Sequence, residues 1–374
     1  MRFATAEMIK NKGRFGAIIS AIALIVFLVL VLSAIADGLW IGATGALRES
    51  GASVFTFSSD GRKSFIRSEL REHDVDRVAG VAGVAAAGPV GALLGTARGP
   101  HGLLDLGLFG FEPGKPGGPV RIVEGRSIGP GETGKGVADV ALRDRGIKMG
   151  DRITFTGSDT PVEVIGFAED SRYQLQPTLW TTMETWRQAR QQARPQFGDQ
   201  TDRLNVIAVA TVPGADPATV AAEIDAQLRN TQSLTQIDAI LAIPGTEQQR
   251  STFDTLVMAT FAVATLVIAL FFALLTLEKR ELFATTKALG ASNGFLILGT
   301  ATQAVLCSVL GIAGGALLAA AASLALPASV PAVFLASTAI TVAAATLLTS
   351  LAGAALSFRR LSRIDPATAI GGSG

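Results

Sequence analysis

The chain has 374 residues, of which 49% are hydrophobic and only 17% carry a charge. Soluble domains are about 25% charged, so this balance favours a protein that is partly embedded in lipid. The net charge of +1 gives no strong field that would attract nucleic acid. The single cysteine, Cys307, excludes an internal disulfide and is expected to be an inert packing residue.

Hydrophobic residues are concentrated in one segment near the N-terminus and three near the C-terminus. About twenty apolar residues in a helix span the roughly 30 Å hydrocarbon core of a bilayer. A helix also pairs its own backbone N–H and C=O groups, for which lipid offers no hydrogen-bond partners. We therefore predict four transmembrane helices, at 14–37, 253–277, 294–326 and 332–358.

Lysine and arginine cluster at one end of each predicted helix, whereas the link at 325–333 carries no charge. Basic residues near membrane helices remain on the cytoplasmic side. We therefore place both termini, the loop 278–293 and the tail 359–374 in the cytoplasm, and residues 38–252 outside. The clusters are Arg2, Lys10, Lys12 and Arg14; Lys279, Arg280 and Lys287; and Arg359, Arg360 and Arg363.

Two features of the N-terminus have alternative interpretations. Residues 1–13 mix apolar and charged side chains, which fits either an amphipathic helix on the cytoplasmic membrane surface or a plain basic flank that orients insertion. The small residues 33–36 resemble a signal-peptidase site. The apolar run is longer than the 7–15 residues usual for a signal peptide, so an uncleaved helix is favoured.

The segment 38–252 has the pattern of a mixed α+β domain. Alternating apolar residues predict half-buried strands at 52–57 and 152–156, and two further strands are expected at 162–167 and 205–209. Asp216 and Pro217 form a typical helix start, with the helix continuing through 218–228. The glycine- and proline-rich segments 112–119 and 127–133 are predicted loops.

Residues 129–136 nearly match a nucleotide-binding P-loop, but Gly136 stands where the Mg²⁺-binding hydroxyl is required. Glu132 would also place a carboxylate where phosphates belong, so a glycine-rich turn before a strand or short helix is favoured. The only histidines are His73 and His101, and no cluster has metal-ligand spacing. We therefore expect no catalysis, no resident metal and no cofactor in this chain.

The order of one helix, a large outside domain and three helices resembles the FtsX/MacB-type permeases, also called type VII ABC transporters. The motif at 277–292 is similar to the family's cytoplasmic loop, and that at 363–369 is similar to its Asp-Pro-Ala-x-Ala tail. Segments 122–126 and 137–155 resemble its extracytoplasmic domain. One departure is that the loop's acid is Glu281 rather than residue 282. The implied fold is a membrane α-helical protein with four transmembrane helices and an α+β domain inserted between the first two.

The resemblance implies a multi-pass cell-membrane permease that works as a homodimer in lipid with two copies of a separate ATPase, which would bind ATP and Mg²⁺. The loop 278–293 would then transmit ATPase closure; the alternative is an ordinary solvated loop. Gly311 and Gly315 form a G-x-x-x-G pattern that fits helix packing within one protomer or between two. The expected coupling residues are Arg280, Glu281, Phe283, Lys287 and Gly290.

A subgroup of this family exports haem, and haem is the first substrate hypothesis. Glu49, about three turns beyond the first apolar run, is a candidate ligand for ferric iron, with Tyr173 and Met258 as further candidates. The alternatives are a solvated Glu49 paired with Arg48, and ordinary packing for the other two. Lipoproteins, peptides, lipids and drugs are other substrate classes. A non-transporting regulator of a cell-wall hydrolase and a receptor without an ATPase are the other functional hypotheses.

Overall fold

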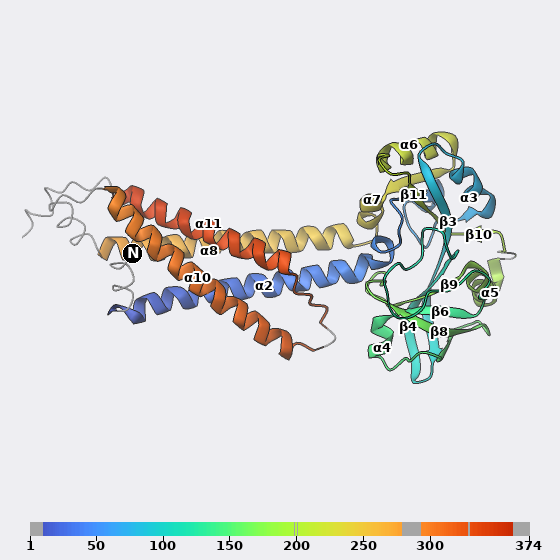
Figure 1. Ribbon diagram of the computed structural model, residues 1–374, viewed down its shortest axis with the longest axis horizontal. Coiled ribbons are helices and arrows are strands. Elements are labelled where there is room, and N and C mark those ends of the chain that lie inside the picture. The colour runs from blue at the N-terminus through green and yellow to red at the C-terminus, as the bar shows by residue number, and fades with distance from the viewer. Residues whose placement is uncertain (1–9, 198, 200, 279–292, 328–329, 362–374) are drawn as a thin grey trace, which may run out of the picture. The chain divides into compact units, whose positions relative to one another are not determined.

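The computed structural model describes residues 10–197, 199, 201–278, 293–327 and 330–361 (Figure 1). The chain divides into two compact units. The first, here the membrane unit, consists of Met1–Gly38 and Arg250–Gly374. The second, here the extracytoplasmic unit, consists of Leu39–Gln249.

Four described helices are long and apolar enough to cross a membrane. They are α2 (Lys12–Arg48), α8 (Thr246–Glu278), α10 (Asn293–Ala325) and α11 (Ala336–Leu361). Three bounds differ from the sequence prediction by more than three residues. Helix α8 begins at Thr246 rather than 253. Helix α2 continues past Asp37 to Arg48, since no proline interrupts it and its last turns pack inside the extracytoplasmic unit. Helix α11 begins at Ala336 rather than 332, because residues before it pack as a linker against α2.

The membrane unit is held together by close helix packing. A Cβ atom on Gly311 would lie 2.5 Å from Ile22 of α2, and one on Gly315 would lie 2.7 Å from Ala23 and Val26. The two glycines of the G-x-x-x-G pattern therefore let α10 approach α2 of the same chain. Cys307 is fully buried among the same apolar side chains, as expected for a packing residue.

The described part of the extracytoplasmic unit contains a ten-stranded mixed sheet in the order β12-β1-β11-β3-β4-β9-β6-β8-β5, with β7 paired to β3 and β8. A separate two-stranded sheet pairs β2 (Leu70–Arg71) with β10 (Arg203–Leu204). The ten strands are β1 (Val54–Ser58), β3 (Val84–Gly99), β4 (Gly102–Phe111), β5 (Ile122–Gly125), β6 (Lys135–Asp139), β7 (Arg152–Phe155), β8 (Pro161–Ala168), β9 (Thr178–Thr182), β11 (Val206–Thr211) and β12 (Thr231–Thr235).

Within the described part of this unit, five α-helices accompany the large sheet: α3 (Glu72–Ala79), α4 (Val140–Asp144), α5 (Met183–Ala193), α6 (Pro217–Gln227) and α7 (Gln236–Leu241). The predicted start of α6 is confirmed, because the Asp216 carboxylate accepts the Thr219 N–H at 3.0 Å. The predicted strands correspond to β1, β7, β8 and β11, and both predicted loops lie between strands.

Side chains alternate between two hydrophobic cores on the two faces of the sheet, because successive residues of a strand point to opposite sides. Val54 belongs to the core that contains α3, α5 and α6 residues, whereas Phe55 belongs to the core that contains α7 and the end of α2. The prediction of a half-buried β1 is therefore wrong: every residue of this strand is buried. The aromatic-rich face packs against the last turns of α2.

The P-loop-like segment is a turn before β6, and the carboxylate of its own residue Glu132 lies where a phosphate would bind. The Glu132 carboxylate accepts a hydrogen bond from the Gly129 N–H at 2.7 Å. It also accepts hydrogen bonds from both terminal guanidinium nitrogens of Arg126, at 2.6 and 2.7 Å. The hydrogen bond from Arg126 and then that from Gly129 lower the pKa of Glu132 to about 2. Lys135 pairs with Glu163 at 2.9 Å. The groups that would bind a phosphate are thus engaged within the protein.

Candidate functional site at the end of helix α2

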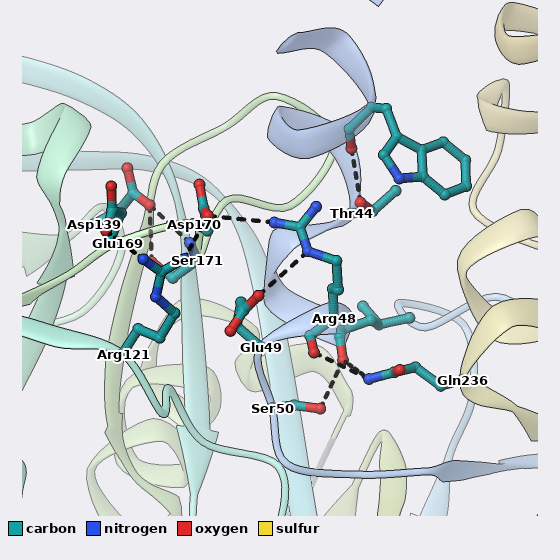
Figure 2. Close-up of polar contacts among 12 residues, drawn as sticks. Thr44, Arg48, Glu49, Ser50, Arg121, Asp139, Glu169, Asp170, Ser171 and Gln236 are labelled. Carbon is teal, nitrogen blue, oxygen red and sulfur yellow. Dashed lines mark hydrogen bonds and ion pairs between the residues drawn. The ribbon is translucent and has the colours of Figure 1, made fainter. Parts of the chain in front are cut away.

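The last turns of α2 are enclosed by loop 169–176, which runs along the helix (Figure 2). A Cβ atom on Gly45 would lie 2.1 Å from the carbonyl oxygen of Asp170 and 2.6 Å from its carbonyl carbon. A Cβ on Gly42 would lie 3.0 Å from a methyl group of Leu175. The glycine at position 45 therefore allows a backbone-to-backbone approach that no other residue would permit.

Hydrogen bonds fix this loop to the helix. The Ala46 N–H donates to the Arg172 carbonyl at 2.9 Å, and the Gln174 N–H donates to the Ala43 carbonyl at 3.0 Å. The next N–H of the loop donates to the Gly42 carbonyl, also at 3.0 Å. Positive φ angles at loop residues 170, 174 and 175 make this path possible, at a cost that the contacts with α2 offset.

Two further segments bind the carbonyl groups that every helix leaves unpaired at its C-terminus. The side chain of Gln236 donates to the Leu47 and Arg48 carbonyls, both at 3.0 Å. The glycine- and proline-rich segment 112–120 reaches the following two carbonyls, because the N–H groups of residues 117 and 120 donate to Ser50 at 2.8 Å and Glu49 at 3.1 Å. We call residues 39–51, together with loop 169–176, segment 112–120 and Gln236, the α2 junction.

Alternating charges line the junction (Figure 2). The Glu49 carboxylate lies 3.4 Å from Nε of Arg48, and Nη2 of Arg48 lies 3.5 Å from Asp170. Arg121 in turn contacts Asp170 at 3.1 Å and Glu169 at 2.9 Å. The side chain of Glu49 is 25% exposed, so it remains accessible to a ligand while pairing with Arg48.

Loop 169–176 is anchored on its other side by a buried acid. The carboxylate of Asp139, which is 0% exposed, accepts the Ser171 hydroxyl at 2.8 Å and the Ser171 N–H at 3.1 Å. It also accepts the Ala141 N–H at 2.9 Å and lies 3.7 Å from Arg172. Burial raises the pKa of Asp139, and its hydrogen-bond donors and Arg172 oppose that effect. Asp139 thereby positions the loop that contacts α2.

The other two haem-ligand candidates lie in different surroundings. Tyr173 is part of the junction loop, but its side chain is 1% exposed and packs against Phe65 and Phe109 with ring centroids 5.7 and 5.6 Å apart. Burial raises the pKa of Tyr173, which disfavours the tyrosinate that would ligate iron. Met258, on α8 in the membrane unit, is 71% exposed. The structure thus brings Glu49 and Tyr173 into one unit and leaves Met258 in the other.

The expected coupling residues at 280–290 lie outside the described residues. Within the described part of the chain, no three histidine, cysteine, aspartate or glutamate side chains form a group that could hold a metal ion. The junction therefore offers accessible carboxylates, those of Glu49, Glu169 and Asp170, each paired with a guanidinium.

Sequence reasoning proposed Glu49 as a candidate ligand but did not point to Gly42, Gly45, Asp139 or Gln236, which the structure places around it. A glycine pair three residues apart at 42 and 45 was the available signal for a close approach at this helix. The start of α4 at Asp139 was a second signal, since aspartate followed by a helix is a common cap.

The described residues include four helices long and apolar enough to cross a membrane and a separate sheet-containing unit, an architecture typical of a multi-pass membrane protein with a folded domain outside the lipid. The family model of the MacB-like periplasmic core domain matches residues 15–227, and that of the FtsX-like permease C-terminal region matches residues 255–366. The chain therefore belongs to the FtsX/MacB-type permeases of ABC transporters.

Two named relatives illustrate the range of this similarity. A Staphylococcus epidermidis protein named "Putative hemin transport system permease protein HrtB" is 22% identical over 231 residues, which covers 62% of this chain and 61% of that protein. The chain thus spans less than two thirds of that relative. An uncharacterized ABC transporter permease of Mycobacterium tuberculosis is 25% identical over 375 residues and covers 99% of both chains.

Two solved structures also match parts of the chain. The periplasmic region of MacB from Actinobacillus actinomycetemcomitans matches with a TM-score of 0.39 and 13% identity, covering 53% of this chain and 96% of that one. The extracellular domain of YknZ, an ABC-type transporter from Gram-positive bacteria, matches with a TM-score of 0.36 and 18% identity, covering 49% and 98%.

Proposed function

We propose that this chain is the membrane subunit of an ATP-driven exporter. Two copies would assemble with two copies of a separate ATPase, which hydrolyses ATP on the cytoplasmic side. The loop 278–293, including Arg280, Glu281, Phe283, Lys287 and Gly290, would receive the motion of the ATPase. Both chain termini would be cytoplasmic, as the basic clusters indicate.

The observation that carries this proposal is the number of independent attachments at the α2 junction. Three segments distant in sequence bond to the last turns of one membrane helix. A hydrogen bond contributes about 0.5–1.5 kcal/mol in a folded protein, so the set resists separation of helix and domain. A displacement of α2 would therefore move the extracytoplasmic domain, which is what a mechanical exporter requires.

For the substrate we propose haem, or another amphiphile with an acidic group, taken from the outer leaflet. Glu49 supplies an oxygen ligand suited to ferric iron, and Arg48 supplies a cation suited to a propionate of the same molecule. Binding would replace the contact at 3.4 Å between these two side chains with contacts to the substrate. Met258, in the membrane unit, is kept as a separate candidate ligand. We assign Tyr173 to packing, because its side chain would have to leave the aromatic core to reach a ligand.

The test is a haem titration of the full-length protein in nanodiscs, followed by the Soret band, with wild type, Glu49→Gln and a matched control. The control is Glu163→Gln, which removes the same charge from an acid of similar exposure that pairs with Lys135 outside the junction. We expect Glu49→Gln to weaken binding by about tenfold or more, equivalent to about 1.4 kcal/mol. The control should bind like wild type. An unchanged spectrum and affinity in Glu49→Gln would remove Glu49 from the site.

The transport step is tested separately from haem binding. The permease is purified from native membranes, and its copurifying ATPase is assayed with and without haem. An exporter should show haem-stimulated ATP hydrolysis. Absence of any nucleotide-binding partner, or capture of a cell-wall hydrolase with no effect of haem, would overturn the export proposal.

A further inference from the structure

A cavity of about 320 Å³ lies in the membrane unit, between α2, α10 and the start of α11. Its walls are apolar except for one acid and two hydroxyl residues. The lining residues that matter for its chemistry are Leu30, Asp37, Ala316, Ala320, Phe334 and Thr338. Small alanine side chains on α10 leave the space that larger residues would fill.

The linker before α11 forms a fixed border of this cavity. The Val333 N–H donates to the Ala34 carbonyl of α2 at 2.9 Å. A Cβ atom on Gly38 would lie 1.9 Å from the carbonyl oxygen of Pro331, so the glycine allows the linker to lie directly on the helix. The cavity is therefore held in place by backbone contacts on its linker side.

Among the described residues that line the cavity, Asp37 is the only acid. Its carboxylate accepts one hydrogen bond, from the Thr338 hydroxyl at 2.7 Å. Among the described residues, no lysine, arginine or histidine nitrogen lies within 4.0 Å of it. A carboxylate can accept about four hydrogen bonds. Asp37 is the last residue of the first predicted membrane span, at its boundary with the headgroups, and an acid with so few partners there favours the approach of a cation or further donors.

We propose that this cavity binds the headgroup of a membrane phospholipid that carries a primary ammonium group, with the ammonium on Asp37. The ammonium supplies the charge and the donors that the carboxylate lacks. The volume is at the lower end of ligand pockets, roughly 300–1,000 Å³, so it suits a headgroup rather than a whole lipid. Leu317, which follows Ala316 and is 72% exposed, offers apolar surface for an acyl chain beside the cavity.

This inference concerns a different unit from the α2 junction and does not depend on the substrate proposed above. An anionic lipid would be repelled by Asp37, whereas a lipid with a primary ammonium group would be attracted. The preference for one lipid headgroup over the other should therefore depend on Asp37, and substituting Asp37 tests it.

The test is native mass spectrometry of the full-length protein, with added phosphatidylethanolamine or phosphatidylglycerol of identical acyl chains. Wild type should retain phosphatidylethanolamine in preference to phosphatidylglycerol. Asp37→Asn should weaken retention of phosphatidylethanolamine by about tenfold or more and abolish the preference, since it removes a charge-assisted contact. The control Asp254→Asn, at a membrane-unit acid that is 71% exposed, should behave like wild type.

A second variant tests the cavity itself. Ala320→Phe places a large side chain on an exposed lining position and should reduce retention of phosphatidylethanolamine while keeping the wild-type thermal transition. Equal retention of both lipids by wild type would overturn the proposal, as would undiminished retention of phosphatidylethanolamine by Asp37→Asn. If Asp37→Asn dissociated a dimer with no change in lipid retention, a second copy of the chain would be the occupant and the lipid proposal would be wrong.

Discussion

Replacing Gly45 by alanine has two opposing effects on the stability of the extracytoplasmic unit. Alanine is favoured over glycine in a helix by about 1 kcal/mol. Against this, the new methyl group would lie 2.1 Å from a backbone oxygen of Asp170, a distance that no side-chain rotation can relieve. Overpacking of this kind costs about 1–3 kcal/mol.

Displacing the loop would also weaken the hydrogen bond from the Ala46 N–H to the Arg172 carbonyl, now 2.9 Å long. Losing that bond costs about 1 kcal/mol. The steric and hydrogen-bond losses together exceed the gain in helix propensity. We expect Gly45→Ala to destabilise the unit by about 1–3 kcal/mol, which corresponds to a fall in Tm of roughly 3–10 °C for a unit of this size.

Tryptophan fluorescence during heating of the full-length protein is the assay. All three tryptophans, Trp40, Trp180 and Trp186, belong to the extracytoplasmic unit, so the signal reports on that unit. Gly42→Ala is the matched control on the same helix. Its methyl group would meet only the ends of two flexible side chains, Leu175 at 3.0 Å and Arg172 at 3.9 Å. It should change Tm by less than about 2 °C, because the steric cost is small against the propensity gain.

The comparison of Gly45→Ala with Gly42→Ala decides whether the close approach is real. If Gly45→Ala unfolded at the same temperature as Gly42→Ala, loop 169–176 would not be held against α2 in the way the structure shows. The proposal that α2 moves the domain would then lose its support, whatever the substrate.

Two further predictions concern other parts of the chain. The lowered pKa of Glu132, about 2 in the folded protein against 4.5 ordinarily, means that its pairing with Arg126 stabilises the loop fully above about pH 4.5 and is lost as the pH falls through about 2. Carboxyl NMR titration measures that pKa, and Glu132→Gln should remove this pH dependence; a pKa near 4.5 would refute the pairing. In α10, Gly315→Leu should lower the yield of folded protein because the new side chain forces α10 away from α2. The control Gly299→Leu, whose Cβ would have nothing within 4 Å, should express like wild type. Equal yields of the two variants would contradict the packing of α10 on α2.

Much of the architecture could be predicted because it depends on local composition. Each membrane helix is specified by its own apolar run, since a segment of that length in lipid has no alternative to a helix. The start of α6 at Asp216 and the rejection of a phosphate site at 129–136 likewise depended on residues within a few positions of each other. Gly136 and Glu132 together were the reason to reject the nucleotide site, and the structure places the Glu132 carboxylate on the loop's own N–H group.

The predictions failed where a distant segment decides the outcome. The burial of β1 on both faces requires α7 and the end of α2, neither of which alters the alternation of its sequence. The continuation of α2 to Arg48 is similar, because its last carbonyls are satisfied by Gln236, which lies 188 residues away in the chain. A charged residue such as Asp37 marks the end of an apolar run but does not end a helix.

The sequence by itself determined that the chain has four segments long and apolar enough to cross a membrane and a mixed domain between the first two, because hydrophobic length and strand periodicity are properties of contiguous residues. It also identified Glu49 as an acid near a membrane helix. Only the tertiary structure decided what surrounds that acid, and that Asp139, Gly45 and Gln236 form the junction. Their contacts join residues whose separation in the chain carries no periodic signal, so only folding brings them together.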